Sequence, residues 1–470
     1  MIRTDFIQRT LRTEVVGARC EQFESVSTDS RSDSANSLFF ALKGPTFNGH
    51  DFLAAAMERG SIGAVIERDH LERARVMMGR RLQKFSLIPV SDTQVALQEL
   101  AAAYRRTLGT IIVAITGSNG KTTTKEMIAS ILSEKGKVHK TEGNLNNLIG
   151  LPLMVFRIMP DHVFAVLEMG MNQPGEIAAL TQIAMPDVAI VTNAHPAHLE
   201  GLGSVDAIAD EKFSIFAGLR EGGTAVINAE DPALMARAAG HAGRRLFYGA
   251  KAGCDTRLLS SSTLGMEGQV LTLDTGHGAF EARIPHLGRH NALNATAAAA
   301  AAVACGASDA EIAEGLQEVQ VVSRRLEHEL IAGVHVLNDV YNANPKSMDG
   351  ALETLVSIRG QGRAFAVLGD MLELGPGSRE LHAELGRAAA RYGVSGLIVL
   401  GAESGSTVGG AVEAGMDAAL CFKAIDAADA AWVLRKRVRP GDWVLVKGSR
   451  GMKMEQVIEQ FRQAYSGGLS

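Results

Sequence analysis

The stretch IIVAITGSNGKTTTKEM (residues 111–127) restricts the possible folds most, because an apolar segment runs directly into a glycine-rich turn and then into a helical pattern. A buried strand followed by such a turn presents backbone N–H groups and the positive end of a helix to an anion. Lys121 would reach the β- and γ-phosphates of a nucleotide, and the Thr122 hydroxyl would bind Mg²⁺. The predicted phosphate-binding residues are Gly117, Ser118, Asn119, Gly120, Lys121, Thr122 and Thr123.

The general phosphate-loop pattern has a glycine at position 115, where this chain has Ile115, so that the motif is only partly matched. The alternative interpretation is a glycine turn that merely precedes a capped helix. The Gly-Lys-Thr sequence between the strand and the helix favours phosphate binding over this alternative.

Apolar strands alternate with helical patterns along most of the 470 residues, and this length exceeds that of one ordinary domain. After the glycine loop, buried strands near residues 164, 188 and 224 predict a parallel sheet covered on both faces. A similar alternation occupies residues 35–66 and begins again after residue 322. We therefore expect an α/β protein with three domains, at residues 1–107, 108–321 and 322–470.

Composition excludes several classes of function. The net charge of −5 does not favour non-specific nucleic-acid binding, and no apolar run approaches the roughly 20 residues of a membrane span. The first ten residues, MIRTDFIQRT, lack the apolar segment of a secretory signal. The four cysteines are scattered without CxxC spacing, which argues against structural zinc and a disulfide framework. We expect a cytoplasmic protein.

Polar residues that follow the central strands are candidates for metal binding. Glu168 ends a buried strand, where open α/β sheets bind ligands, although an ordinary surface glutamate is an equal alternative. His195 and His198 are three residues apart but lack a third soft ligand for zinc. A histidine that helps carboxylates to hold Mg²⁺ is the better functional interpretation, and a hydrogen-bonded loop histidine is the alternative. Lys212, judged alone, is expected on a helix surface.

Asn291 and Asn294 stand one turn apart at the start of an alanine-rich helical stretch. Their amide groups can pair with the donor and acceptor edge of a base, whereas the alternative for Asn291 is capping of the helix. Arg325 could hold a phosphate and Asp339 the ribose hydroxyls. Five further residues stand where two later strands end, at the face on which α/β folds bind ligands: Asp370, Glu373, Lys447, Ser449 and Arg450.

Taken together, several stretches resemble the Mur ligases, the ATP-dependent amide-forming ligases of peptidoglycan synthesis. The resemblance spans residues 27–455 and all three domains, and it explains the missing glycine, because this family uses the shorter GxNGKT form. The stretches that carry it are STDSR (27–31), LFFALKGPTFNGHDF (38–52), GSNGKTTTKEM (117–127), EMGMNQPGEI (168–177), TNAHPAHLEGLGS (192–204), YNANPKSM (341–348), LGDMLELG (368–375) and VKGSRGMKME (446–455).

The resemblance implies an N-terminal α/β domain that binds a UDP-muramoyl peptide, a central P-loop ATPase domain with a mostly parallel sheet, and a C-terminal Rossmann-like domain. It is strongest to the members that join D-alanyl-D-alanine to UDP-N-acetylmuramoyl-tripeptide through an acyl phosphate, with ATP becoming ADP and phosphate. The implied cofactors are ATP and Mg²⁺. We expect a monomer that neither binds nucleic acid nor inserts into a membrane.

The resemblance also implies roles for single residues. Thr122 would hold a first Mg²⁺, Glu168 and His198 a second, and Lys212 matches a lysine that is carbamylated in related ligases. Asn338 stands at the first position of a pair that is often Asp-Asp, and Asp339 keeps the second. The implied ATP-binding residues beyond the loop are Asn291, Asn294, Arg325 and Asp339; the implied substrate-binding residues are Ser30, Arg31 and Thr46 for the UDP substrate and Asn342, Asp370 and Lys447 for the amine.

Two alternatives remain at this point. A sibling ligase would add a single amino acid, as the diaminopimelate- or lysine-adding enzyme or a folylpolyglutamate synthase does, but the YNANP and LGDMLELG pair argues for the dipeptide-adding member. A regulatory P-loop NTPase would hydrolyse ATP without dependence on an amine. We also expect hinges near residues 107 and 322, because the domains must close around an acyl phosphate to exclude water.

Overall fold

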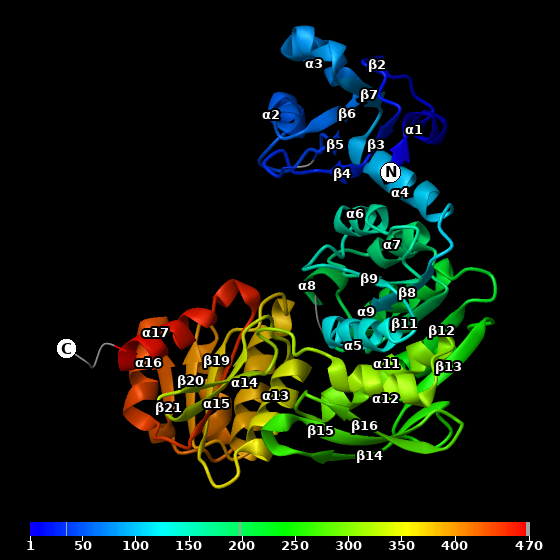
Figure 1. Cartoon of the computed structure of the whole chain (residues 1–470). Helices are drawn as coiled ribbons and strands as arrows, with labels where there is room; N and C mark the ends of the chain where they lie inside the picture. The colour runs from blue at the N-terminus through cyan, green and yellow to red at the C-terminus, as the bar shows by residue number, and fades with distance from the viewer. Residues whose placement is uncertain (34, 197–198, 467–470) are drawn as a thin grey trace.

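The computed structural model describes residues 1–33, 35–196 and 199–466 and consists of three α/β parts, each built on its own main sheet (Figure 1). The main sheets lie within residues 16–90, 111–284 and 327–447. The expected α/β fold with three parts is therefore confirmed. The domain boundaries at residues 107 and 321 fall between the sheets and stay predictions. None of the described helices is long and apolar enough to cross a membrane.

The N-terminal part has a five-stranded sheet in the order β2-β7-β6-β5-β4, parallel except for β2, and a short β1-β3 pair. Apolar residues of α1 and α4 pack on one face of the sheet and those of α2 and α3 on the other. The elements are β1 (Ile2–Arg3), α1 (Thr4–Leu11), β2 (Val16–Gly17), β3 (Gln22–Phe23), β4 (Ser25–Ser27), β5 (Ser37–Phe40), α2 (Leu53–Glu58), β6 (Ser61–Glu67), α3 (Leu71–Met78), β7 (Ser86–Val90) and α4 (Thr93–Arg105).

Helix α4 connects the N-terminal part to the central part (Figure 1). Asp92 begins it as an N-cap whose side chain accepts hydrogen bonds from the next helical N–H groups. At its other end, the fully buried Arg105 donates to the carbonyl oxygens of Ala184 (2.8 Å) and Met185 (3.1 Å) and to the Asp187 carboxylate (3.0 Å). The helix is thus fastened to the central part immediately before the hinge expected near residue 107.

The central part has a nine-stranded sheet in the order β16-β15-β14-β13-β12-β11-β8-β10-β9. Its strands are parallel from β9 to β14, whereas β15 and β16 add antiparallel hairpins that the sequence analysis did not predict. The elements are β8 (Ile111–Thr116), α5 (Lys121–Ser133), β9 (Val138–Lys140), α6 (Gly150–Phe156), β10 (Phe164–Glu168), α7 (Glu176–Ala184), β11 (Val188–Val191), α8 (Leu199–Leu202), α9 (Val205–Phe213), β12 (Thr224–Asn228), α10 (Pro232–Ala238), β13 (Arg244–Gly249), β14 (Thr256–Thr263), β15 (Gln269–Asp274), β16 (Ala279–Ile284), α11 (Arg289–Ala304) and α12 (Asp309–Glu318).

Helices α5, α11 and α12 cover one face of the central sheet, and α6, α7, α9 and α10 cover the other. The alanine-rich helical stretch expected near residue 300 is α11, and its alanine run is fully buried between α5 and the sheet. Because alanine has a short side chain, the α11 backbone comes close to α5, and the first turns of both helices lie beside the glycine loop.

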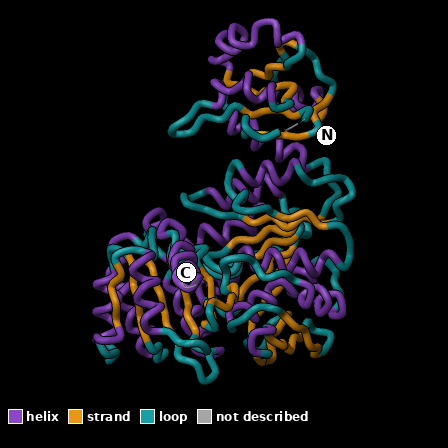
Figure 2. Tube along the Cα trace, turned by 60° about the vertical axis from the view of Figure 1, so that its left-hand side comes forward, coloured by secondary structure: helices purple, strands orange, loops and turns teal. Residues whose placement is uncertain are grey.

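The C-terminal part has a six-stranded sheet in the order β17-β18-β22-β19-β20-β21, in which only β17 is antiparallel. Helices α13, α14 and α15 pack on one face and α16 and α17 on the other, so that Figure 2 shows strands between layers of helices. Strands β18, β19, β20 and β22 continue the alternation expected after residue 322, whereas β17 and β21 were not predicted. The elements are β17 (Glu327–Ile331), β18 (Val334–Asp339), α13 (Pro345–Ile358), β19 (Ala364–Gly369), α14 (Ser378–Arg391), β20 (Gly396–Leu400), α15 (Ser404–Glu413), β21 (Cys421–Ala424), α16 (Ala427–Arg437), β22 (Trp443–Lys447) and α17 (Glu455–Ser466).

Candidate active site

A cavity of about 460 Å³ lies between the central and C-terminal parts. The glycine loop and the start of α11 form one wall, and the carboxyl ends of β18 and β22 form the opposite wall. Most of the residues predicted for ATP, metal or amine binding line it: Ser118, Asn119, Gly120, Lys121, Thr122, Thr123, Glu168, Asn291, Asn294, Arg325, Asp339, Asn342 and Lys447. Residues from two distant segments of the chain thus meet around one space.

The glycine loop has the geometry of a phosphate cradle. Gly120 is the N-cap of α5 and has a φ of +81°, which is unfavourable for residues with a side chain. A Cβ atom on Gly120 would lie 2.4 Å from Asn294 Oδ1, and one on Gly117 would lie 1.8 Å from Thr192 Oγ1. Lys121 donates from Nζ to the Gly117 carbonyl oxygen at 2.7 Å, so its ammonium group lies over the loop.

Glu168 at the end of β10 is almost fully buried, with 4 % of its surface exposed. Its carboxylate accepts hydrogen bonds from the Thr122 hydroxyl (2.9 Å) and from the Asn146 side chain (2.9 Å). The Arg325 guanidinium donates to the same Thr122 hydroxyl at 3.0 Å. A hydroxyl and a carboxylate oxygen held together in this way are the hard ligands that Mg²⁺ prefers. Sequence reasoning missed Asn146, because nothing local distinguishes it from the neighbouring asparagines.

Two lysines near the loop have lowered pKa values. Burial lowers the pKa of Lys121; the Arg325 charge acts in the same direction and the Glu168 carboxylate opposes both. Lys212 in α9 is only 2 % exposed, and burial, together with the charge of Lys121, lowers its pKa well below the usual value against the opposing effect of Glu211. Among the described residues, none accepts a hydrogen bond from the Lys212 ammonium. The expectation of a surface lysine was therefore wrong, because the helix face that carries Lys212 packs inwards.

The two asparagines of α11 lie side by side in the cavity wall. Asn294 Nδ2 donates to Asn291 Oδ1 at 3.0 Å, and Asn291 Nδ2 donates to the Leu287 carbonyl oxygen at 2.8 Å. Gly288 is the N-cap of α11, so the alternative in which Asn291 caps the helix is wrong. The helix begins earlier than expected because Arg289 and His290 already belong to its first turn.

The C-terminal wall contains a buried ion pair. Asp339 and Lys447 are partners in the parallel register of β18 and β22. Lys447 donates from Nζ to Asp339 Oδ2 at 2.6 Å and to the Asn342 carbonyl oxygen at 3.0 Å. The Arg325 guanidinium lies over the Tyr341 ring, 4.2 Å from its centroid.

A second contact joins the glycine loop to the C-terminal part. Asn119 Nδ2 donates to Asn344 Oδ1 at 3.1 Å, and Asn344 Nδ2 donates to Asn119 Oδ1 at 2.7 Å. Asn344 is also the N-cap of α13, where its side-chain oxygen accepts from the Ser347 N–H. The stretch YNANPKSM carries part of the family resemblance, but no local pattern shows that the Asn344 cap faces the glycine loop.

Some predicted residues lie elsewhere. Asp370 is 7 % exposed and accepts hydrogen bonds from the backbone N–H groups of Ala402 and Glu403, so its carboxylate faces the neighbouring turn and not the cavity. His195 lines the cavity, whereas His198 is outside the described residues. The remaining predicted residues that do not line the cavity are Gly117 of the glycine loop, Lys212 of α9, Glu373, Ser449 and Arg450 of the C-terminal part, and Ser30, Arg31 and Thr46 of the N-terminal part.

The three residues expected to bind the UDP substrate lie in loops of the N-terminal part. The exposed Arg31 pairs with Asp29 through Nε at 2.9 Å, and this pairing lowers the pKa of Asp29 to about 2. Thr46 is exposed in the loop that precedes Gly49. These positions leave the side chains accessible to a ligand without showing one.

A histidine cluster in the N-terminal part is a possible metal site by composition. Ligand atoms of His50, Glu67 and His70 lie within 4.8 Å of one another. His50 uses both ring nitrogens, however: Nε2 accepts from the Glu67 backbone N–H (2.8 Å) and Nδ1 bonds to Asn48 Oδ1 (2.7 Å). Burial lowers the pKa of His50 to about 4. The cluster therefore supports the loop around Asn48 and leaves His50 no lone pair for a metal.

Comparison with known proteins gives a consistent picture along the chain. Residues 22–105 match the description "Mur ligase family, catalytic domain", residues 115–302 match "Mur ligase middle domain", and residues 324–450 match "Mur ligase, glutamate ligase domain". The UDP-N-acetylmuramoyl-tripeptide–D-alanyl-D-alanine ligase of Bacillus subtilis is 36% identical over 437 residues, which cover 92% of each chain.

Solved structures agree with the sequence relatives. MurF from Acinetobacter baumannii superposes with a TM-score of 0.89 at 30% identity and covers 98% of this chain and 99% of its own. MurF ligase from Thermotoga maritima, solved in complex with ADP, has a TM-score of 0.82 at 30% identity and covers 94% of this chain and 98% of its own.

Proposed function

The chain belongs to the Mur ligase family, and we infer that it is the ATP-dependent ligase that adds D-alanyl-D-alanine to UDP-N-acetylmuramoyl-tripeptide in peptidoglycan synthesis. Two relatives that carry this name match 92% and 94% of the chain, and a structural relative at 30% identity is solved in complex with ADP. The observation that carries the inference in this chain is the shared cavity, where the phosphate loop faces the strand ends of the C-terminal part. A simple NTPase has no need of this second wall.

The chemistry follows from the weak reactivity of a carboxylate towards amines. The terminal carboxylate of the tripeptide attacks the γ-phosphorus of ATP, ADP leaves, and an acyl phosphate forms. The amine of D-alanyl-D-alanine then attacks the carbonyl carbon, phosphate leaves with the bonding electrons, and the nitrogen loses a proton. Both steps develop negative charge on oxygen, which the cations Lys121 and Arg325 of the cavity wall stabilise.

We assign the ATP phosphates to the loop from Gly117 to Thr123, the adenine to Asn291 and Asn294, and the ribose to Asp339. The narrow space above Gly120, which a Cβ atom would fill, supports a close approach of phosphate to the backbone. Among the described residues, Lys447 is the only one bonded to the Asp339 carboxylate, through Oδ2, so that Oδ1 can accept from a ribose hydroxyl.

We assign Mg²⁺ to the cluster around Thr122 and Glu168, because these side chains already place hard oxygen ligands together at the loop. A Mg²⁺ ion there would neutralise charge on the phosphate oxygens. Glu168 and His198 are proposed for a second ion. Asn146 holds the Glu168 carboxylate in place from the other side and is the supporting residue that we add to this set.

We further propose that Lys212 is carbamylated. Addition of CO₂ requires a neutral amine, and burial beside Lys121 favours the neutral form. The nitrogen bonds to the carbon of CO₂ and releases one proton, which gives an anionic carbamate next to the Lys121 cation. This group could orient the second ion.

Carbon-13 NMR in labelled bicarbonate tests the proposal. We expect a carbamate signal in the native protein that Lys212→Met removes. Lys125 is a matched control, because it is equally buried but donates to the Thr141 carbonyl oxygen at 2.6 Å. The signal should survive in Lys125→Met; a native spectrum without it would refute carbamylation.

For the other substrates, we propose that Ser30, Arg31 and Thr46 contact the UDP portion. Asn342 and Lys447, which line the cavity, are proposed for the incoming amine. Asp370 contributes indirectly, because its carboxylate holds the turn after β20. Asn342→Ala should raise the KM for D-alanyl-D-alanine, and an unchanged KM would remove Asn342 from this set.

The decisive experiment measures phosphate release from ATP and Mg²⁺ in the presence of UDP-N-acetylmuramoyl-tripeptide, with and without D-alanyl-D-alanine. The expected result is release that depends on the dipeptide, with a product heavier by the dipeptide minus water. Lys121→Ala should abolish both the phosphate release and the formation of the heavier product. Release with a single amino acid instead would indicate a sibling ligase, and release indifferent to any amine would indicate an NTPase.

A further inference from the structure

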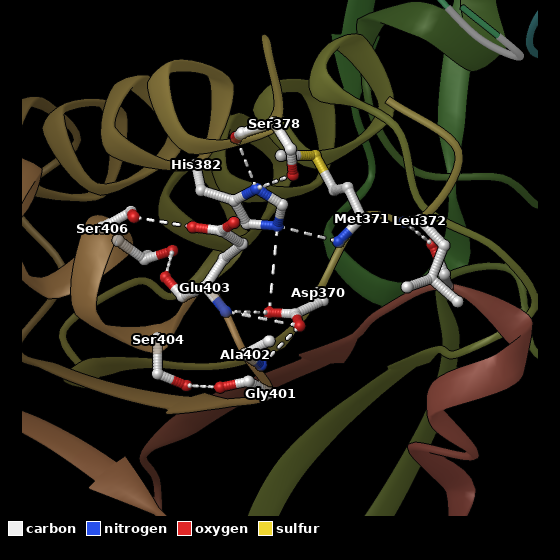
Figure 3. A network of polar contacts seen from close by, with 12 residues as sticks. Asp370, Met371, Leu372, Ser378, His382, Gly401, Ala402, Glu403, Ser404 and Ser406 are labelled. Carbon is white, nitrogen blue, oxygen red and sulfur yellow. Dashed lines mark hydrogen bonds and ion pairs between the residues drawn. The ribbon is translucent and has the colours of Figure 1, made fainter. Parts of the chain in front are cut away.

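A buried histidine of the C-terminal part has no role in the chemistry above. His382 in α14 is 1 % exposed (Figure 3). Its Nε2 lies 3.0 Å from the backbone N–H of Met371, which can only donate, so Nε2 accepts and the ring proton is on Nδ1. Nδ1 donates to the Ser378 carbonyl oxygen at 2.8 Å. One imidazole therefore holds both ends of the loop between β19 and α14.

Two further side chains fix the start of this loop. The Asp370 carboxylate, 3.9 Å from His382 Nε2, accepts from the N–H groups of Ala402 and Glu403 in the turn after β20 (Figure 3). The buried Ser449 donates from its backbone N–H to the Asp370 carbonyl oxygen (3.1 Å) and accepts from the Leu372 N–H (2.8 Å). Three consecutive residues, from Asp370 to Leu372, are thus held by hydrogen bonds to three separate segments: the turn after β20, α14 and Ser449.

The loop leads from this anchored start to the central part. Its last turn, Gly375–Gly377, lies next to α8 of the central part. Ser449 also donates to the Ala343 carbonyl oxygen at 3.4 Å, next to Asn342 in the cavity wall. The position of the loop is therefore coupled both to the contact between the two parts and to the wall proposed for the amine.

We propose that His382 is a positioning residue of the ligase reaction, which fixes the loop from Met371 to Gly377 and thereby sets the C-terminal wall against the central part. This proposal rests on the proposed function. Most of the residues assigned to ATP, the phosphate loop and the two asparagines of α11, belong to the central part, so loss of the imidazole should weaken binding of the amine more than binding of ATP. His382 touches no substrate and acts only through the loop.

The test compares three variants. His382→Leu removes both hydrogen bonds at similar volume, whereas His382→Gln can still accept from the Met371 N–H and donate to Ser378. His286→Leu is the matched control, because His286 is a buried histidine whose ring nitrogens have no hydrogen-bond partner among the described residues. Hydrogen exchange at the Met371 and Leu372 amides measures directly how firmly the start of the loop is held. The KM values for the amine and for ATP measure the effect of the loop on binding.

For His382→Leu we expect amide exchange at Met371 to accelerate about tenfold and the KM for D-alanyl-D-alanine to rise about five- to tenfold, which is the scale of one lost hydrogen bond. The KM for ATP should change by less than about twofold. His382→Gln should keep the native exchange rate at Met371 and the native KM values for both substrates. An unchanged exchange rate, or equal rises in both KM values, would overturn the proposal.

Two outcomes need separate treatment. If His382→Leu does not fold, Ser449→Ala, which removes the acceptor for the Leu372 N–H, provides the same comparison of exchange and KM. If phosphate release by the native protein does not depend on D-alanyl-D-alanine, the proposed function fails. The exchange experiment still decides whether His382 fixes the loop from Met371 to Gly377. The KM comparison is then made with the amine that the native protein accepts.

Discussion

Replacement of Gly120 by alanine separates two requirements of the glycine loop, backbone conformation and space. Gly120 is the N-cap of α5 with φ +81° and ψ −7°, and Gly175 is the N-cap of α7 with φ +87° and ψ −9°. In this left-handed conformation a side chain costs about 1–2 kcal/mol. A Cβ on Gly175 would have no neighbour within 4 Å among the described residues, so Gly175→Ala measures the backbone cost alone.

Gly120→Ala adds a steric cost inside the cavity. Its Cβ would lie 2.4 Å from Asn294 Oδ1, which must move and lose the hydrogen bond between Asn294 Nδ2 and Asn291. That bond is worth about 0.5–1.5 kcal/mol, and displacement of a proposed adenine contact should weaken ATP binding about tenfold, or ~1.4 kcal/mol. Calorimetric titration with ATP measures the affinity, and urea denaturation measures the free energy of unfolding.

The two variants should therefore lose similar stability from backbone strain, and only Gly120→Ala should lose ATP affinity. Native affinity in Gly120→Ala would show that Asn294 is not a nucleotide contact. An equal loss of affinity in Gly175→Ala would show that general strain, and not the space above the loop, controls binding.

Two further predictions concern buried charge. Lys447→Met leaves the Asp339 carboxylate buried without its cation, so the free energy of unfolding in urea denaturation should fall by about 3–5 kcal/mol. Arg31→Met removes an exposed ion pair and should lower the same free energy by less than about 1 kcal/mol. Burial, aided by the charge of His290, lowers the pKa of His286 to about 4, below an unfolded value near 6.5. The folded protein thus disfavours protonation of His286, whereas the unfolded chain takes up the proton near pH 6.5. The free energy of unfolding should therefore fall as the pH drops from about 6.5 towards 4, by at most ~1.4 kcal/mol per pH unit. His286→Phe should reduce the difference between unfolding free energies at pH 7.5 and pH 5 by this contribution; an unchanged difference would assign the pH dependence to other groups.

Local patterns were sufficient for the features that depend on neighbouring residues in the chain. The phosphate loop was predictable because β8, the glycines and α5 are contiguous from Ile111 to Ser133. The parallel sheets were predictable because their buried strands are nearly continuous apolar runs. Strands β14 to β16 were missed, because they lack the nearly continuous apolar runs of the parallel strands: β14 (TRLLSSST) is mostly polar and exposed, and β15 and β16 are interrupted by polar residues.

The environment of single side chains was harder to predict. Lys212 has the sequence context of a surface lysine, and only the packing of α9 against the central part shows that it is buried. Asp370 stands correctly at a strand end but turns towards the loop after the neighbouring strand, because the N–H groups of Ala402 and Glu403 lie closer than the cavity does. Position in a strand thus predicts the edge of the sheet and not the direction of the side chain.

Contacts between distant segments are the features that no local pattern can contain, and here they join the glycine loop to the C-terminal part. Arg325, which follows the linker expected near residue 322, donates to the Thr122 hydroxyl while that hydroxyl donates to Glu168. If Mg²⁺ binds at Thr122 as proposed, the ion and the Arg325 guanidinium compete for the hydroxyl oxygen, and we expect Arg325 to turn towards a bound phosphate. Because Asn119 and Asn344 hold the C-terminal part on the loop, we expect such an exchange to couple nucleotide binding to the wall proposed for the amine.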